Sequence, residues 1–331
     1  VLIILTPQSM TDAIGTAEAI VNISTSSLKP VVCAFMGVVD VSDGVQLLQK
    51  HKIPVYHFPE SAARSLGALR KGMKWLFRKI LPQYDLQFDR ERAGRIIKES
   101  MKAGKMVLGE LDGNELLQCY GFKTLNMDLA KSKAEAGKMA AKIGFPVVMK
   151  IVSKDILHKT DAGGVMVGLK DKKGVEEAFE TIMERAVEYK PDADIDGVLI
   201  QQFAPKGKEV ILGLSKDPVF GHAVMFGMGG IFVEAYKDVV FGLSPMGRNV
   251  ARRMVKSIKG HTILKGVRGE APSDIETIEK NIVSLKMMAE HHPQIRELDI
   301  NPLFVHEEGQ GSTVADIIVR LEDNNNEKDK E

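Results

Sequence analysis

A lysine, a histidine and a pair of glycines lie close together in the segment KIVSKDILHKTDAGGVMVGL, residues 150–169. Strand alternation places Lys150 on the same face as Val148 and Val152. Because an unpaired buried ammonium costs free energy, Lys150 either extends to the edge of its strand or meets an anion. A lysine that leads into a glycine-containing loop favours a phosphate as that anion.

His158 stands in the loop that follows this strand. One interpretation is an exposed histidine without a role. The other is a general base, a metal ligand or a phosphoryl acceptor, since a neutral imidazole is nucleophilic near pH 7. Gly163 and Gly164 allow a close backbone approach, and their consecutive N–H groups could line an anion site.

A second group of polar side chains follows near the C-terminal end. Asp299 and Asn301 stand two positions apart in LDINPL, so a strand places both on one face. Asp316 lies in the next predicted strand and could face them across a hairpin. Oxygen ligands of this kind suit Mg²⁺, which fills the rest of its shell with water and phosphate oxygens. Alternatively, Asp299 and Asn301 only open the turn before Pro302.

Composition excludes several classes of protein. The chain of 331 residues is 44% hydrophobic, enough for more than one core, and its net charge of +1 comes without a basic stripe that would favour nucleic acid. No Walker A sequence is present, and the glycines of MFGMGGIFVEAYKDV do not open a helix, which excludes a Rossmann dinucleotide site. Cys33 and Cys119 form no CxxC motif, and no apolar run reaches the roughly 18–20 residues of a membrane span. We therefore expect a cytoplasmic protein without a membrane partner.

The pattern of elements changes near residue 90. Residues 1–77 alternate apolar strands (VLIIL, PVVCAF, IPVYHF) with helical patterns, which predicts a parallel sheet covered on both faces. Residues 78–89 are expected to form a linker. From 90 to 322 we expect helices mixed with strands, among them a helix opened by the capping box of Ser273 and Glu276. Residues 323–331 lack apolar side chains and are expected to be disordered.

Together these segments resemble the ADP-forming (NDP-forming) acyl-CoA synthetases, relatives of succinyl-CoA synthetase. GFPVVMKIVSKDILHKTDAGGV, VLIQQFAPKGKEVILGLSKDPVFG, MFGMGGIFVEAYKDV, GVRGEAP and ELDINPL carry the resemblance within residues 90–322. It implies an α/β protein that ends in a two-lobed ATP-grasp α+β domain. Through LIILTPQSMTD and KPVVCAFMG, residues 1–77 resemble part of the flavodoxin-like CoA-ligase domain of that family, a doubly wound parallel sheet.

The resemblance also implies which residues bind the nucleotide, ATP or ADP. Lys150 matches the ATP-grasp lysine that contacts its phosphates. Gln201 and Gln202 fall in the segment between the lobes that holds adenine, and Glu209 is implied to lie near the nucleotide. Arg268, in GVRGEAP, is implied to contact phosphate.

The remaining implied roles concern the metal and the phosphoryl group. Asn301 and Asp316 match Mg²⁺ ligands, and Asp299 matches an acidic residue beside the phosphohistidine station. His158 falls on the histidine of the ILHKSDxGGV-type loop, which in ADP-forming acetyl-CoA synthetases is a second phosphoryl carrier. Thr160 replaces the commoner serine of that loop.

The function implied is that of an acid–thiol ligase, for which CoA, a short-chain acid (we expect acetate) and phosphate are substrates. Val1 lies inside an apolar strand without an initiator methionine, so we expect a piece of a longer polypeptide. The CoA-binding domain and the domain with the first phosphohistidine are then partners, in the same chain or in a separate subunit, and we expect an oligomer. Two alternatives are the ligand-sensing part of a protein lysine acetyltransferase and a carboxylate–amine ligase.

Overall fold

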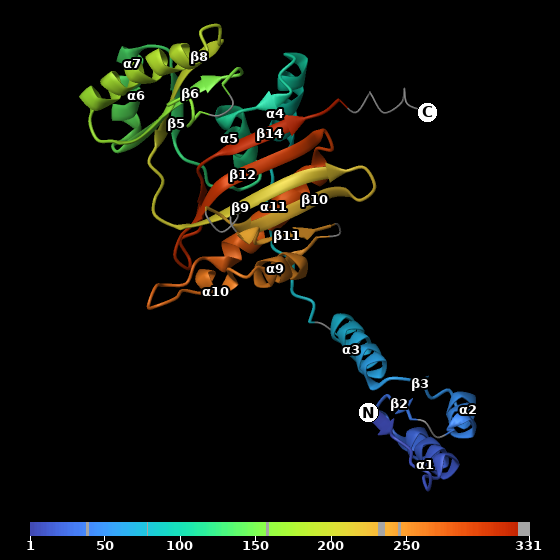
Figure 1. Cartoon of the computed structure of the whole chain (residues 1–331). Helices are drawn as coiled ribbons and strands as arrows, with labels where there is room; N and C mark the ends of the chain where they lie inside the picture. The colour runs from blue at the N-terminus through green and yellow to red at the C-terminus, as the bar shows by residue number, and fades with distance from the viewer. Residues whose placement is uncertain (38–39, 78, 157–158, 231–235, 244–245, 324–331) are drawn as a thin grey trace. The chain divides into compact units, whose positions relative to one another are not determined.

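The computed structural model describes the whole chain except residues 38–39, 78, 157–158, 231–235, 244–245 and 324–331. The chain divides into two compact units, residues 1–80 and 81–331 (Figure 1). No helix among the described residues is long and apolar enough to cross a membrane. The predicted tail, 323–331, falls outside the described residues apart from its first position.

The first unit is a small parallel sheet with helices. Its strands pair in the order β1 (Leu2–Leu5), β2 (Val32–Phe35) and β3 (Val55–Tyr56). A helix follows each strand, namely α1 (Ala13–Ser26), α2 (Ser42–Lys50) and α3 (Pro59–Leu76). Continuous burial of β2 fits a strand covered by helices, and the predicted parallel sheet is confirmed.

The second unit opens with α4 (Arg90–Lys102), β4 (Val107–Leu108) and α5 (Glu110–Gln118). An antiparallel four-stranded sheet follows, in the order β5 (Met127–Ala130), β8 (Ile195–Gln202), β6 (Val147–Ser153) and β7 (Val165–Leu169). Two helices pack on it, α6 (Lys133–Ile143) and α7 (Lys172–Tyr189), and together they enclose an apolar core of their own.

A larger antiparallel sheet completes this unit. Its order is β11 (Val239–Gly242), β10 (Gly221–Met228), β9 (Lys208–Asp217), β12 (Ile295–Val305), β14 (Ile317–Leu321) and β4, and β13 (Ser312–Val314) also pairs with β12. The helices that follow β11 are α9 (Arg248–Ser257), α10 (His261–Leu264) and α11 (Ile275–His291). α11 packs on β9, β10 and β12, while α5 packs on β14. The expected fold class, an α/β protein with a parallel sheet followed by an α+β domain, is confirmed, and both sheets of the second unit are antiparallel.

Two local expectations need correction. Helix α11 is capped by Asp274 rather than by Ser273, because the Asp274 carboxylate accepts from the N–H of Thr277 at 3.0 Å and also from those of Gly309 and Gly311. The strand predicted to contain Asp316 is interrupted, since Asp316 lies between β13 and β14. Both differences arise from contacts between segments that are distant in sequence.

Candidate functional site

A cleft of about 860 Å³ lies between the two sheets of the second unit. Its walls come from β6, β7 and β8 on one side and from β12, β14 and the residues before β14 on the other. The segment 203–207, which joins β8 to β9, lines the cleft between them. Volumes of roughly 300–1,000 Å³ are typical of small-molecule sites.

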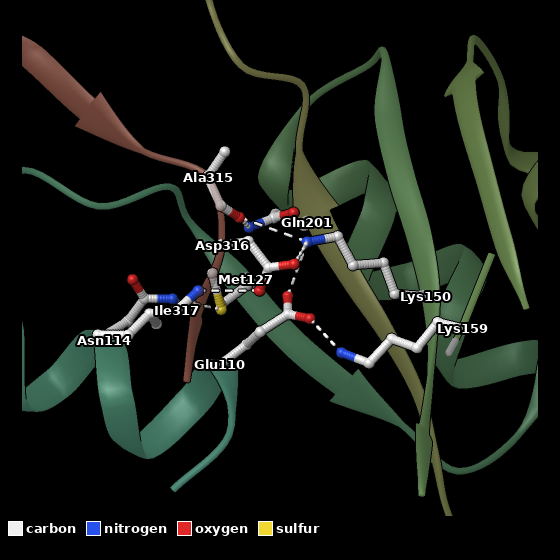
Figure 2. A network of polar contacts seen from close by, with 9 residues as sticks. All are labelled: Glu110, Asn114, Met127, Lys150, Lys159, Gln201, Ala315, Asp316 and Ile317. Atoms are coloured by element: carbon white, nitrogen blue, oxygen red, sulfur yellow. Dashed lines mark hydrogen bonds and ion pairs between the residues drawn. The ribbon is translucent and has the colours of Figure 1, made fainter. Parts of the chain in front are cut away.

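Lys150 extends from β6 into this cleft. Met149 and Ile151 are buried in the core beneath, which confirms the strand face predicted for Lys150. The ammonium lies 2.9 Å from Oε2 of Glu110, 3.3 Å from the carbonyl oxygen of Ala315 and 3.8 Å from Oδ2 of Asp316 (Figure 2). Lys150 therefore meets an anion from the protein itself.

Glu110 is the functional candidate that the sequence interpretation missed. It is the first residue of α5, its side chain is 5% exposed, and its second carboxylate oxygen accepts from Nζ of Lys159 at 2.5 Å. Burial alone would raise the pKa of Glu110, but the two ammonium groups outweigh burial and lower it. In sequence, an acidic residue in the first turn of a helix indicates only a favourable dipole interaction.

Asp316 and Asn301 lie side by side, because the Asn301 N–H donates to the Asp316 carbonyl oxygen at 3.3 Å. Asp299 and Asn301 are exposed on β12, while Leu298 and Ile300 between and beside them are buried. The hairpin expected from the sequence is thus present. Of these three polar residues, Asp316 is the one that lines the cleft.

The pKa values of Asp316 and Asp299 are both raised above the ordinary value of an aspartate. Burial raises the pKa of Asp316, and the nearby Glu110 carboxylate raises it further, against the opposing effect of Lys150. Desolvation also raises the pKa of Asp299, followed by the charges of Glu297 and Asp316. A cation at this position would favour the ionised form of both carboxyls.

Gln201 and Gln202 both line the cleft at the end of β8. Gln201 is buried and donates from Nε2 to the Ala315 carbonyl oxygen at 2.9 Å. Gln202 accepts from the N–H of Asn126 through its side-chain oxygen at 3.4 Å. Apolar side chains complete these walls, among them Leu125, Val148, Val165, Val167, Phe304 and Ile318.

Two of the predicted nucleotide residues lie away from the cleft lining. Glu209 is exposed on β9, where its carbonyl oxygen accepts from the N–H of Gly229 at 2.8 Å. Arg268 is exposed between α10 and α11, with a left-handed φ of 52°. Their predicted contacts with the nucleotide stay predictions.

His158 lies outside the described residues. The three residues after it, Lys159, Thr160 and Asp161, line the cleft. The glycine pair does not form the anion site that the sequence allowed, because the N–H groups of Gly163 and Gly164 donate to the carbonyl oxygens of Thr160 and Lys159. These hydrogen bonds close a turn at the end of the loop.

The donor set fits an ion that takes few protein ligands. Among the described residues there is no cluster of three or more histidine, cysteine or acidic side chains that could hold a metal. Asp316 lines the cleft and its backbone carbonyl accepts from the Asn301 N–H, while Mg²⁺ in phosphate sites takes one or two carboxylates together with water and substrate oxygens.

Comparisons with known proteins agree with this geometry. The ATP-grasp domain family model matches residues 99–321. The chain is 39% identical over 97% of its length to a 4-hydroxybutyrate–CoA ligase (ADP-forming) of Nitrosopumilus maritimus, of which it covers 46%. It is 46% identical over 70% of its length to the whole β subunit of acetate–CoA ligase (ADP-forming) I of Pyrococcus furiosus.

A solved structure gives the same result. The dinucleotide forming acetyl-coenzyme A synthetase 1 of Ca. Korarchaeum cryptofilum, in complex with coenzyme A and Mg-AMPPCP, is 35% identical with a TM-score of 0.61. The match covers 70% of this chain and 100% of that chain, whose phosphohistidine segment points towards the nucleotide binding site. These relatives are ligases and synthetases, and they lend no support to the alternative of an acetyltransferase-linked sensor.

Proposed function

Because this chain belongs to the ATP-grasp family, whose fold binds nucleotide, we propose that it is the nucleotide-handling part of an ADP-forming acyl-CoA ligase. In this role the chain transfers a phosphoryl group between ATP or ADP and His158, with Mg²⁺ bound. The observation that carries the proposal is the Lys150 ammonium, held at 2.9 Å by Glu110 on the wall of a cleft large enough for a nucleotide.

Different side chains of the cleft bind different parts of the nucleotide in this proposal. The ammonium of Lys150 pairs with the phosphates and offsets charge on the transferring group, the main requirement of phosphoryl transfer. Gln201 and Gln202 end β8, directly before the segment 203–207, and in this proposal they orient the base. His158 takes the phosphoryl group on a ring nitrogen and passes it on.

Asn301 and Asp316 are the residues that would hold Mg²⁺. When bound, the ion supplies positive charge to the phosphate oxygens. Asp299, exposed on the same face of β12 as Asn301, would accept a hydrogen bond from the imidazole and orient it. Glu209 and Arg268 keep secondary roles near the nucleotide phosphates in this proposal.

The chain spans less than half the length of the 4-hydroxybutyrate–CoA ligase that it matches. For the complete enzyme we propose the reaction of acyl-CoA, phosphate and ADP to give the acid, CoA and ATP, with acetyl-CoA as the acyl donor. The CoA-binding and first-phosphohistidine domains are its partners, and an oligomer and a cytoplasmic location are part of the same proposal. Cys33 and Cys119 are both free and buried, in keeping with a reducing compartment.

The test is phosphoenzyme formation from γ-labelled ATP and Mg²⁺. We expect an acid-labile, base-stable label on the wild-type chain and none on His158→Ala. Equal labelling of the two proteins would overturn the carrier role of His158. Binding of ATP without any labelling of the wild type would favour a sensor over a transferase.

A further inference from the structure

We propose that Lys159 is a second phosphate-binding cation of the cleft, which acts on the phosphoryl group in transit, and that Glu110 is the residue that positions it beside Lys150. The inference rests on the proposed function, because it concerns the same phosphoryl group. Lys159 is added as a binding residue and Glu110 as a positioning residue, and the family resemblance gives neither of them a role in phosphoryl transfer.

A single carboxylate joins the two ammonium groups. Oε2 of Glu110 accepts from Lys150 at 2.9 Å, and Oε1 accepts from Lys159 at 2.5 Å (Figure 2). The two nitrogen atoms are therefore no further apart than two hydrogen bonds and the width of one carboxylate. A phosphoryl group, with three oxygens around one phosphorus, has a similar span and can accept from both ammonium groups at once.

Glu110 and the two lysines come from different parts of the second unit. Glu110 begins α5, which packs on β14 of the larger sheet, whereas Lys150 lies on β6 of the smaller sheet and Lys159 follows that strand. The Glu110 side chain is 5% exposed and those of Lys150 and Lys159 are 12% and 28% exposed. With little water to compete, the carboxylate fixes where both cations stand.

Lys159 is also well placed along the chain. It directly follows His158, and it lines the cleft together with Thr160 and Asp161. Its carbonyl oxygen accepts from the N–H of Gly164 at 2.8 Å, which holds the backbone next to the proposed acceptor. A cation is thereby fixed one residue from the group that receives the phosphoryl.

The step that this cation serves can be written in full. The bond from the γ-phosphorus to the bridging oxygen breaks and leaves its electron pair on ADP. A lone pair on a ring nitrogen of His158 forms the new P–N bond, and the imidazolium so formed releases its other ring proton to solvent. Charge on the three phosphoryl oxygens during this exchange is what a positioned ammonium stabilises.

The first test replaces Lys159. We expect Lys159→Gln to lower the rate constant for phosphoenzyme formation at saturating ATP by about 100-fold, while the Kd for ATP changes by less than about threefold. The matched control is Lys154→Gln, whose side chain is 72% exposed and pairs with Asp194 outside the cleft lining. A Lys159→Gln rate equal to that of the control would overturn the role of Lys159, while loss of label in His158→Ala would still support the proposed function.

The second test asks whether Glu110 acts through Lys159. We expect Glu110→Gln to lower the rate constant for labelling about tenfold. In the double variant Glu110→Gln/Lys159→Gln, the rate constant should fall by a much smaller factor than the product of the two single-variant factors. Urea unfolding of each variant identifies those that remain folded. Fully multiplicative effects in folded variants would overturn the positioning role, whereas a wild-type chain that never labels would overturn the proposed function and this inference together.

Discussion

The Lys150 side chain lies in a place that is largely closed to water. Its side chain is 12% exposed, and the ammonium is surrounded by the Glu110 and Asp316 carboxylates and the Ala315 carbonyl oxygen. A buried cation requires such partners, because its desolvation is otherwise not compensated. The arrangement keeps a positive charge ready at the cleft wall without any ligand.

Replacement of this lysine is expected to weaken nucleotide binding. Lys150→Gln removes a charge-assisted contact worth about 2 kcal/mol, so the Kd for ATP should rise about 30-fold by calorimetry. Glu110 retains its bond to Lys159 in this variant, and we expect a folded protein.

The matched control is Lys172→Gln on α7, where the lysine is exposed and pairs with Glu176 at 3.6 Å. This variant should bind ATP as the wild type does. If Lys150→Gln also bound ATP with wild-type affinity, the cleft around Lys150 would not be the phosphate site.

The sequence predicted Lys150 as a site residue and missed its partner, Glu110. Alternation around Lys150 showed that its side chain faces away from the core, which requires only neighbouring residues. The identity of its anion depends on α5 packing against β14, a contact between residues far apart in the chain. No local pattern distinguishes Glu110 from any acidic residue in a first helical turn.

Among the elements, the turn before β7 is closely packed at Gly164. A Cβ atom on Gly164 would lie 2.4 Å from Cγ2 of Ile151 and 3.1 Å from the carbonyl oxygen of Lys159. Glycine is therefore needed at this position for close approach to β6 rather than for an anion.

We expect Gly164→Ala to lower the free energy of unfolding by about 1–3 kcal/mol and to slow phosphoenzyme formation, because the displaced turn carries Lys159. Gly174→Ala in the first turn of α7 is the control, since its Cβ would lie 3.4 Å from Asp171. Urea titration of both variants measures the difference. Equal stability of Gly164→Ala and wild type would contradict the packing described here.

The end of α11 carries a second element-scale feature. His292 is 7% exposed, its ring lies 5.9 Å from that of Tyr120, and its Nε2 has no hydrogen-bond partner among the described residues. Burial, followed by the charges of His291 and Arg90, lowers the pKa of His292 to about 4. The folded protein therefore holds this imidazole neutral where the unfolded chain would protonate it.

This histidine is expected to make stability depend on pH. As the pH falls from about 6.5 to about 4 the unfolded state binds the proton first, so the free energy of unfolding falls by up to about 3 kcal/mol. Above about pH 7 the neutral His292 makes its full contribution to the free energy of unfolding. Urea unfolding of wild type and His292→Gln at pH 7.5 and pH 5 measures it, and an unchanged difference between the two proteins at the two pH values would contradict it.

For the whole molecule, the site is assembled from segments that only the tertiary fold brings together. β4, near the start of the second unit, pairs with β14 near its end, and this pairing places α5 and Glu110 beside the strands of the larger sheet. Strand alternation predicted the strands of Lys150 and of Asp299 but could not give their order in the sheets, because pairing between distant strands leaves no local trace. The predicted boundaries at 77, 90 and 322 stay predictions.

Reversal of the transfer tests whether His158 carries the phosphoryl group between the nucleotide and the rest of the enzyme. Phosphoenzyme labelled from γ-labelled ATP is freed of nucleotide and mixed with ADP and Mg²⁺, and the products are separated. We expect most of the label to return as ATP in the wild type, and the return to be at least about 10-fold slower in Lys150→Gln. Label that stays on the wild-type protein, or that leaves as free phosphate, would contradict it.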